Sequence, residues 1–306
     1  MTLADYVNTL GQALLRRYGE RVHKLAINVG MTCPNRDGSK GQGGCIFCNN
    51  ASFAPNNHRA SSIAGQIAAG RAVIQRRTGA RRYLAYFQAY SNTYAALPIL
   101  RALYDTALSE PDVIGISVGT RPDCIDPGVI QLLVEYQTRG KEVWLELGLQ
   151  SAFDETLVRI KRGHGFAEYQ MAIRLARIAG LAVCTHLIIG LPGESNWHYH
   201  QTFKQVLDLG VDGIKLHPLH VVRDTPLAHY WRQGEYLPLT LEEYINTVAD
   251  LVELAPPEIV FHRLTGTAAP EILVAPDWCA KKWAVLNGIT AEFQRRNSRQ
   301  GAAWKS

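Results

Sequence analysis

Short apolar runs alternate with amphipathic stretches along most of the chain. The apolar runs predict strands at 24–29, 83–87, 113–118, 143–149, 182–189 and 213–219. The amphipathic stretches predict helices at 3–18, 62–77, 97–108, 128–138, within 154–179 and at 197–208. Strands separated by helices favour a parallel sheet with right-handed crossovers. Six such units are too few for a closed eight-stranded barrel, so the pattern predicts an α/β fold: a partial, open (β/α)6 barrel of the TIM type.

The alternation ends near residue 240. A predicted helix at 241–254 is stopped by Pro256-Pro257, and a strand-like segment at 258–261 and a helix at 278–296 follow. These elements are too few for a second enzyme domain, so we expect a short α-rich extension that caps the barrel. The expected divisions are an N-terminal helix (1–22), the partial barrel (23–240) and a C-terminal extension (241–306).

Composition sets only broad limits. With 47% hydrophobic residues among 306, the chain can bury a full core. No apolar run approaches the roughly 20 residues that span a bilayer, and the N-terminus lacks the pattern of a secretory signal. We therefore expect a cytoplasmic protein with reduced cysteines and no membrane partner. The net charge of +5 suits a nucleic-acid partner, but many unrelated enzymes share it.

Three of the six cysteines lie in one glycine-rich segment, as Cys33-x11-Cys45-x2-Cys48. Glycine tolerates positive φ, so this segment can fold tightly and direct N–H groups at thiolates or sulfides. A structural zinc site needs four ligands, and His58 would have to supply the fourth. A [4Fe–4S] cluster on three cysteines would instead leave one iron open to a small chelating molecule. The residues alone leave both metals possible.

The other cysteines add no second metal site. Cys124, Cys184 and Cys279 are scattered along the chain and lack the spacing of ligands.

Polar residues gather where the predicted strands end, the edge at which α/β proteins place their active groups. These strand exits are 88–94, 119–123, 148–151 and 190–194, with Lys215, His217 and His220 at the last strand. Each residue also has an ordinary explanation. Glu146 is explained as a paired core carboxylate, His186 as a hydrogen-bonded buried histidine and Arg162 as a helix cap. These explanations do not predict that all of them recur at one edge.

The cysteine spacing, with Ile46-Phe47 before the third cysteine, looks like the cluster signature of the radical S-adenosylmethionine (SAM) superfamily. Segments 120–123, 146–151, 160–164 and 186–194 resemble its Elongator-catalytic-subunit-like branch in order and spacing. More narrowly, the chain is similar to the compact YhcC/YtqA-like family over about residues 20–290. The resemblance implies a partial (β/α)6 barrel, a [4Fe–4S] cluster, SAM as cofactor and an electron donor of the flavodoxin or ferredoxin type.

The resemblance also implies a role for individual residues. Cys33, Cys45 and Cys48 would each bind one iron, and SAM would bind the fourth. The residues expected to contact SAM are Phe47, Gln88, Ala89, Tyr90, Gln150, Arg162, His186, Ile189 and Gly190. Among these, Phe47 is expected near the adenine, Gln150 near the ribose or methionyl group, and Arg162 at the carboxylate.

Two departures from the Elongator-like branch affect this SAM contact set. Those relatives usually carry Glu where this chain has Gly119, so one expected contact is missing. Their glycine-rich motif after the second strand is replaced by Gln88-Ala89-Tyr90, which stands where the relatives bind the SAM amino group. The cysteine assignment is unaffected by either change.

The chemistry implied is reductive cleavage of SAM to a 5′-deoxyadenosyl radical, which abstracts hydrogen from a substrate. Elongator-like relatives modify the wobble uridine of tRNA, so the analogy favours tRNA modification, although this chain has no acetyltransferase domain. Two alternatives stay open: a zinc-binding structural module, and a cluster-holding barrel that binds RNA or protein without SAM turnover. Basic pairs that either contact phosphate or are solvated helix ends lie at 16–17, 76–77, 81–82 and 281–282.

Overall fold

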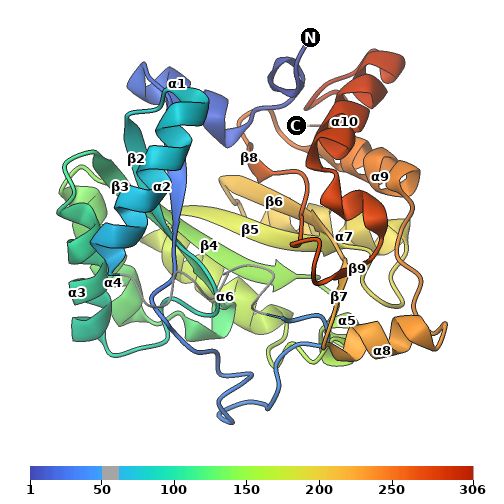
Figure 1. The fold of residues 1–306 in the computed structure, drawn as a ribbon, viewed down its shortest axis with the longest axis horizontal. Helices are drawn as coiled ribbons and strands as arrows, with labels where there is room; N and C mark the ends of the chain where they lie inside the picture. Colours follow the sequence, from blue (N-terminus) through green and yellow to red (C-terminus); the bar gives the residue numbers. More distant parts are fainter. Residues whose placement is uncertain (50–61, 306) are drawn as a thin grey trace.

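Seven parallel strands form one curled sheet in a computed structural model that describes residues 1–49 and 62–305 (Figure 1). In sheet order the strands are β1 (Val22–Ile27), β2 (Arg82–Phe87), β3 (Val113–Thr120), β4 (Glu142–Gln150), β5 (Ala182–Ile189), β6 (Gly213–Pro218) and β8 (Val260–Arg263). Within this part of the chain the edge strands β1 and β8 do not pair with each other. The prediction of an open, partial barrel is therefore confirmed.

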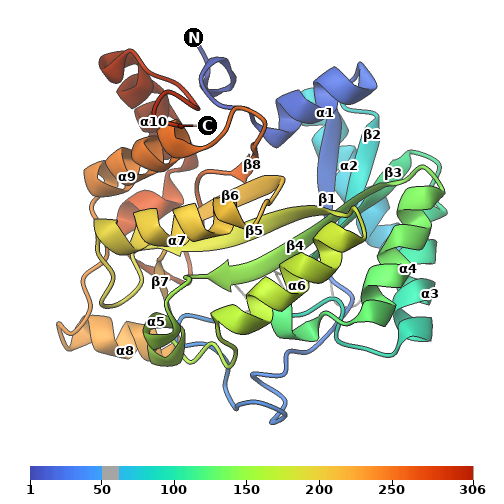
Figure 2. The same ribbon diagram turned by 180° about the vertical axis from the view of Figure 1, so that it is seen from behind.

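Helices cover the outer face of the sheet, as Figure 2 shows for α4, α6 and α7. The covering helices are α2 (Ile63–Thr78), α3 (Leu97–Leu108), α4 (Pro127–Thr138), α5 (Asp154–Arg159), α6 (Phe166–Ile178) and α7 (Asn196–Asp208). Alternate strand residues such as Phe87, Leu145 and Val183 are fully buried in the hydrophobic core. A parallel sheet is covered on its outer face in this way, which explains why its strands read as nearly continuous apolar runs.

The first predicted helix, 3–18, is shorter in the structure. Residues Leu3–Asp5 form a separate 3-10 turn (η1), and α1 runs from Leu10 to Tyr18. The break has a tertiary cause: the Asn8 backbone N–H donates to the Gln300 side chain at 2.8 Å. Leu10 and Leu14 then pack with Val22, Leu84 and Trp144, and this apolar plug fills the barrel interior at the end where the strands begin.

The C-terminal segment contributes a strand to the sheet. We counted six strands and assigned 258–261 to the extension, but β8 pairs in parallel with β6. The remaining elements are α8 (Pro226–Arg232), α9 (Leu241–Leu254), α10 (Lys282–Arg296), the 3-10 turns η4 (Pro122–Cys124) and η5 (Asp277–Ala280), and a ribbon of β7 (Val221–Val222) with β9 (Leu273–Ala275). None of the described helices is long and apolar enough to cross a bilayer.

Candidate metal centre and adjoining cavity

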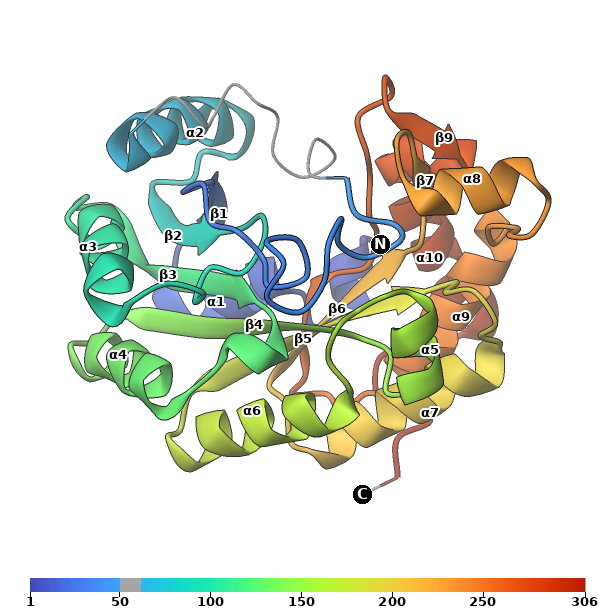
Figure 3. The same ribbon diagram turned by 90° about the horizontal axis from the view of Figure 1, so that it is seen from below.

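The cysteine loop follows β1 and lies over the end of the barrel where the strands finish (Figure 3). Two backbone hydrogen bonds hold Ile46 of this loop in place. The Ile46 N–H donates to the Ile160 carbonyl at 3.1 Å, and the Leu227 N–H donates to the Ile46 carbonyl at 2.9 Å. Cys33 and Cys45 are buried and Cys48 is partly buried. The three thiols therefore lie at the end of the barrel where the strands finish.

Each thiol sulfur has a different guanidinium beside it. The Arg121 Nη1 lies 3.8 Å from the Cys33 sulfur, and the Arg162 Nη1 lies 3.6 Å from the Cys45 sulfur. The Arg36 Nη1 lies 3.9 Å from the Cys48 sulfur. Each guanidinium carries the charge opposite to that of a thiolate, the form of cysteine that binds metals.

Burial opposes the arginines at Cys48. It raises the pKa of the Cys48 thiol to about 11, with a further rise from neighbouring Cys45 and an opposing effect from Arg36. A metal that binds here would therefore displace a proton from Cys48, as thiolate coordination generally does.

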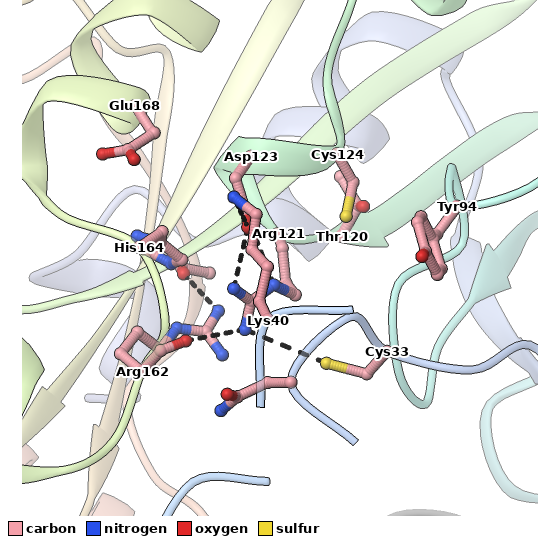
Figure 4. A network of polar contacts seen from close by, with 12 residues as sticks. Cys33, Lys40, Tyr94, Thr120, Arg121, Asp123, Cys124, Arg162, His164 and Glu168 are labelled. Carbon is pink, nitrogen blue, oxygen red and sulfur yellow. Dashed lines mark hydrogen bonds and ion pairs between the residues drawn. The ribbon is translucent and has the colours of Figure 1, made fainter. Parts of the chain in front are cut away.

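Arg121 ties the cysteine loop to the barrel (Figure 4). Its guanidinium donates to both oxygens of Asp123 at 2.9 Å and to the Arg162 carbonyl at 2.8 Å. Lys40, from the loop, forms an ion pair with the same Asp123 at 2.8 Å. Burial alone would raise the pKa of Asp123, but hydrogen bonds from Arg121 and Lys40 lower it to about 2. The carboxylate therefore stays charged and holds both cations.

The spacing of the three thiols separates the two metals considered above. A tetrahedral zinc ion, with Zn–S bonds of about 2.3 Å, would hold its sulfur ligands about 3.8 Å apart. In the described structure the sulfurs of Cys33, Cys45 and Cys48 do not all lie within 4.8 Å of one another. A four-iron cluster places each thiolate on a different iron and so spaces them more widely. The donor set therefore fits the cluster; His58, the fourth zinc ligand considered, lies outside the described residues.

A cavity of about 220 Å³ adjoins the cysteines. Most residues expected to contact SAM line it together with the three cysteines: Phe47, Gln88, Ala89, Tyr90, Gln150, Arg162 and His186. Ile189 and Gly190 are not among its lining residues. The Ile189 side chain is buried in the main core, and the Gly190 carbonyl accepts a hydrogen bond from Tyr236 at 2.9 Å. Ile188, one position earlier, faces the cavity instead.

Three non-glycine residues of this cavity adopt left-handed backbone conformations. The φ angles of Ala89, Tyr90 and Gln150 are 73°, 62° and 82°. Such conformations cost an L-residue of order 1–3 kcal/mol and cluster at functional sites. The resemblance noted above implies a glycine-rich motif at these positions in the Elongator-like branch. Ala89 and Tyr90 keep a glycine-like backbone here without the glycines.

One guanidinium nitrogen of Arg162 has no hydrogen-bond partner in the described part of the protein. Its Nη2 donates to the Gly148 carbonyl at 2.6 Å, while its buried Nε has no hydrogen-bond partner in the described part of the protein. A buried donor without a partner is costly, and an anionic ligand group would satisfy it. This observation fits a carboxylate such as that of SAM.

Gly119 also lines the cavity. A Cβ added there would lie 3.2 Å from the Phe87 carbonyl oxygen and 3.6 Å from the Tyr86 ring. A side chain at position 119 would therefore be crowded against the Phe87 carbonyl, and glycine avoids this close contact.

A charged layer lies below the cysteine loop, centred on the fully buried Glu146 of β4. Its carboxylate forms an ion pair with Lys215 at 3.1 Å and accepts a hydrogen bond from His186 Nε2 at 2.6 Å. It also pairs with Lys24, and His262 Nδ1 lies 3.4 Å away. The expectations of a paired core carboxylate and a hydrogen-bonded histidine agree with these contacts. The sequence did not predict that Lys24 and His262 pair with Glu146, because nothing in their segments indicates it.

The electrostatics of this layer follow from burial and from the neighbouring charges. Burial would raise the pKa of Glu146, but Lys215 and Lys24 hold it well below its usual range. Burial lowers the pKa of Lys215 to about 8 and that of His186 to about 4. Glu146, Cys184 and His186 place potential ligand atoms within 4.8 Å of one another. A cation there would compete with two lysine ammonium groups, so these three residues form a poor metal site.

Comparison with known proteins agrees with this geometry. The family model for the radical SAM superfamily matches residues 27–206, and the Radical_SAM C-terminal domain matches residues 211–295. Protein YhcC of Escherichia coli K12 is 50% identical over 99% of this chain and 98% of its own length. YtqA of Bacillus subtilis is 38% identical over 96% of this chain and 91% of its own length.

More distant similarities cover part of a longer protein. A tRNA uridine(34) acetyltransferase of Methanocaldococcus infernus is 30% identical over 53% of this chain and only 30% of its own length. The solved structure of Methanocaldococcus infernus Elp3 with an N-terminal deletion superimposes with a TM-score of 0.70. That match covers 91% of this chain and 64% of the other, at 20% identity, and so concerns the fold.

Proposed function

The chain belongs to the radical SAM superfamily, and from that premise we propose that it binds a [4Fe–4S] cluster through Cys33, Cys45 and Cys48 and SAM in the adjoining cavity. One observation carries the proposal: three thiols too widely spaced for one ion, each beside a guanidinium, border a cavity with room for a ligand. When bound, the cluster and SAM supply reductive cleavage of SAM and hydrogen abstraction from the substrate.

The protein's own residues would orient SAM and exclude water. The free Nε of Arg162 is suited to the SAM carboxylate, and the left-handed backbone at Ala89 and Tyr90 to its amino group. Phe47 and Ile188 offer apolar surface for the adenine. Below them, the apolar plug closes the far end of the barrel. A reactive centre enclosed in this way is shielded from water and side reactions.

Anaerobic reconstitution tests this proposal. We expect about four irons per chain, and 5′-deoxyadenosine with methionine after dithionite and SAM are added. Cys124→Ala is a matched control, because Cys124 lies outside the cavity lining and should leave the yield unchanged. Colourless protein with one zinc would contradict the proposal and favour a structural module. A cluster without SAM cleavage would favour a binding protein.

We further propose tRNA as the substrate and a flavodoxin- or ferredoxin-type protein as the electron donor. Support for tRNA is the partial similarity to tRNA uridine(34) acetyltransferases, together with the basic charge of the chain. Mass spectrometry of tRNA nucleosides from cells with and without the gene tests this. A nucleoside that is lost with the gene would support tRNA modification, whereas an unchanged profile would remove it.

A further inference from the structure

The polar side chains on one wall of the cavity are all basic or imidazole groups, with Pro218 and Leu219 between them. They belong to Lys215 and His217 of β6, His220 just after it, and Arg263 at the end of β8; we call these four residues the β6–β8 wall. No Asp or Glu of the described chain lines the cavity. Behind the wall, the carboxylate of Glu146 pairs with both Lys215 and Lys24. Lys24, Lys215 and Arg263 therefore place three positive charges near the single negative charge of Glu146, which leaves a surplus of two positive charges.

A β-bulge brings Arg263 to this wall. Ile214 pairs with Phe261, but the next residue, Lys215, pairs with Arg263, so His262 is the extra residue of β8. In a regular strand, Arg263 would point to the opposite face from His262. The bulge lets His262 reach Glu146 while Arg263 lines the cavity. Bulges that re-aim a side chain are common next to active sites.

Two polar groups of the wall have no partner within the described part of the protein. The exposed Arg263 guanidinium has no carboxylate partner among residues 1–49 and 62–305. The buried Nδ1 of His220 likewise lacks a hydrogen-bond partner in that part of the chain. The chain after β8 also passes so close to His217 that a Cβ on Gly266 would lie 2.8 Å from its Nδ1. Glycine at 266 therefore leaves room for the histidine ring.

The three arginines beside the cysteines are separate from this surplus of positive charge. Arg36, Arg121 and Arg162 each lie beside one thiol sulfur, so a cluster with three thiolates would use them. The β6–β8 wall contacts none of these sulfurs by hydrogen bond. The Arg263 guanidinium, which has no carboxylate partner in the described chain, is therefore available to an anion that enters the cavity.

We propose that the β6–β8 wall binds an anionic group of the substrate, a carboxylate or a phosphate, with Arg263 as its principal contact. Arginine recognises both groups through two parallel N–H···O bonds. His217 and His220 would add neutral hydrogen-bond donors. The assignment of this anion to the substrate rests on the proposed function, but anion binding itself does not require turnover. A nucleotide phosphate and a small carboxylic acid are the two sources of such a group.

Thermal unfolding of the reconstituted protein with excess SAM tests the wall without measuring SAM cleavage. The probes are inorganic phosphate, uridine 5′-monophosphate and malonate, each compared with sodium chloride at equal ionic strength. We expect at least one probe to raise the unfolding midpoint by several degrees more than chloride. Protection by the two phosphates would indicate a nucleotide, and protection by malonate alone would indicate a carboxylic acid.

Arg263→Gln should abolish the extra protection, and His217→Gln should reduce it. Arg81→Gln is the matched control, because Arg81 is exposed, outside the cavity lining and not ion-paired in the described structure. Equal protection by chloride and all probes would overturn the proposal, as would full protection in Arg263→Gln. Protein that is protected but does not cleave SAM would keep the wall and remove the proposed function. Protein that cleaves SAM but is not protected by any probe would support the proposed function and remove the anion site.

Discussion

The cysteine loop and the charged layer beneath it handle charge in opposite ways. In the loop, three guanidiniums face three thiols at 3.6–3.9 Å, a pairing that is complete only when the thiols are deprotonated on a metal. In the layer, the carboxylate of Glu146 is already paired with Lys24 and Lys215 and hydrogen-bonded by His186. The loop therefore has the charge arrangement of a binding site. In the layer, by contrast, the carboxylate already has its partners within the protein.

This difference predicts that substitutions in the two regions have reciprocal effects. The largest effect expected is the complete loss of iron in Cys45→Ala, because two thiolates do not hold a four-iron cluster. The free energy of unfolding of the cluster-free chain should change by only about 1 kcal/mol, since a small buried side chain is shortened by one atom. Iron analysis, the brown absorbance and urea unfolding measure both. A retained chromophore would contradict the ligand assignment.

Glu146→Gln should behave in the opposite way. Removing one partner of a buried ion pair typically costs 3–5 kcal/mol, about what we expect for the free energy of unfolding here, because two lysines lose their counter-charge. The protein that does fold should still bind iron. The control is Glu135→Gln, which removes a surface ion pair with Arg101 worth about 0–1 kcal/mol. Equal unfolding midpoints in urea for the two variants would remove the distinction between layer and surface.

Acidification sharpens the comparison, because the layer contains buried neutral histidines. Burial lowers the pKa of His186 to about 4 and that of His262 to about 3, whereas an unfolded histidine titrates near 6.5. Between about pH 6.5 and 4 the unfolded chain therefore binds protons that the folded chain does not. The free energy of unfolding should fall with pH by up to about 1.4 kcal/mol per unit per histidine.

Urea unfolding of the cluster-free protein between pH 7 and 5 measures this slope. His262→Gln should reduce the slope of the free energy of unfolding against pH by the contribution of one histidine. A pH-independent free energy of unfolding over this range would mean that these histidines are already protonated in the folded barrel.

The smallest effect concerns the backbone of the cavity. Ala89→Gly should raise the free energy of unfolding by about 0.5–1 kcal/mol, because glycine adopts the φ of 73° without strain. Ala102→Gly, in α3, is the matched control and should lower it by a similar amount, because its helical backbone favours alanine. If both variants are destabilised alike, the left-handed conformation at Ala89 stores no strain.

The same contrast explains what the sequence could predict. The cysteine loop was identifiable because its three cysteines lie within 16 residues of one another and their spacing is typical of a metal-binding loop. The charged layer was not, since Lys24 and His262 are 238 residues apart and meet only through the sheet. Alternation along β5 placed Ile188, rather than Ile189, in the cavity. β8 resembled a tail segment because it is only four residues long, and the bulge that positions Arg263 leaves no mark in its sequence.

The central claim is an iron–sulfur cluster with three cysteine ligands and one iron open to SAM. It is tested most directly by electron paramagnetic resonance of the dithionite-reduced, anaerobically reconstituted protein with and without SAM. We predict the signal of a reduced [4Fe–4S] cluster, whose g-values shift when SAM binds to the open iron. A spectrum that SAM leaves unchanged, or protein that holds no iron under oxygen-free conditions, would contradict the account.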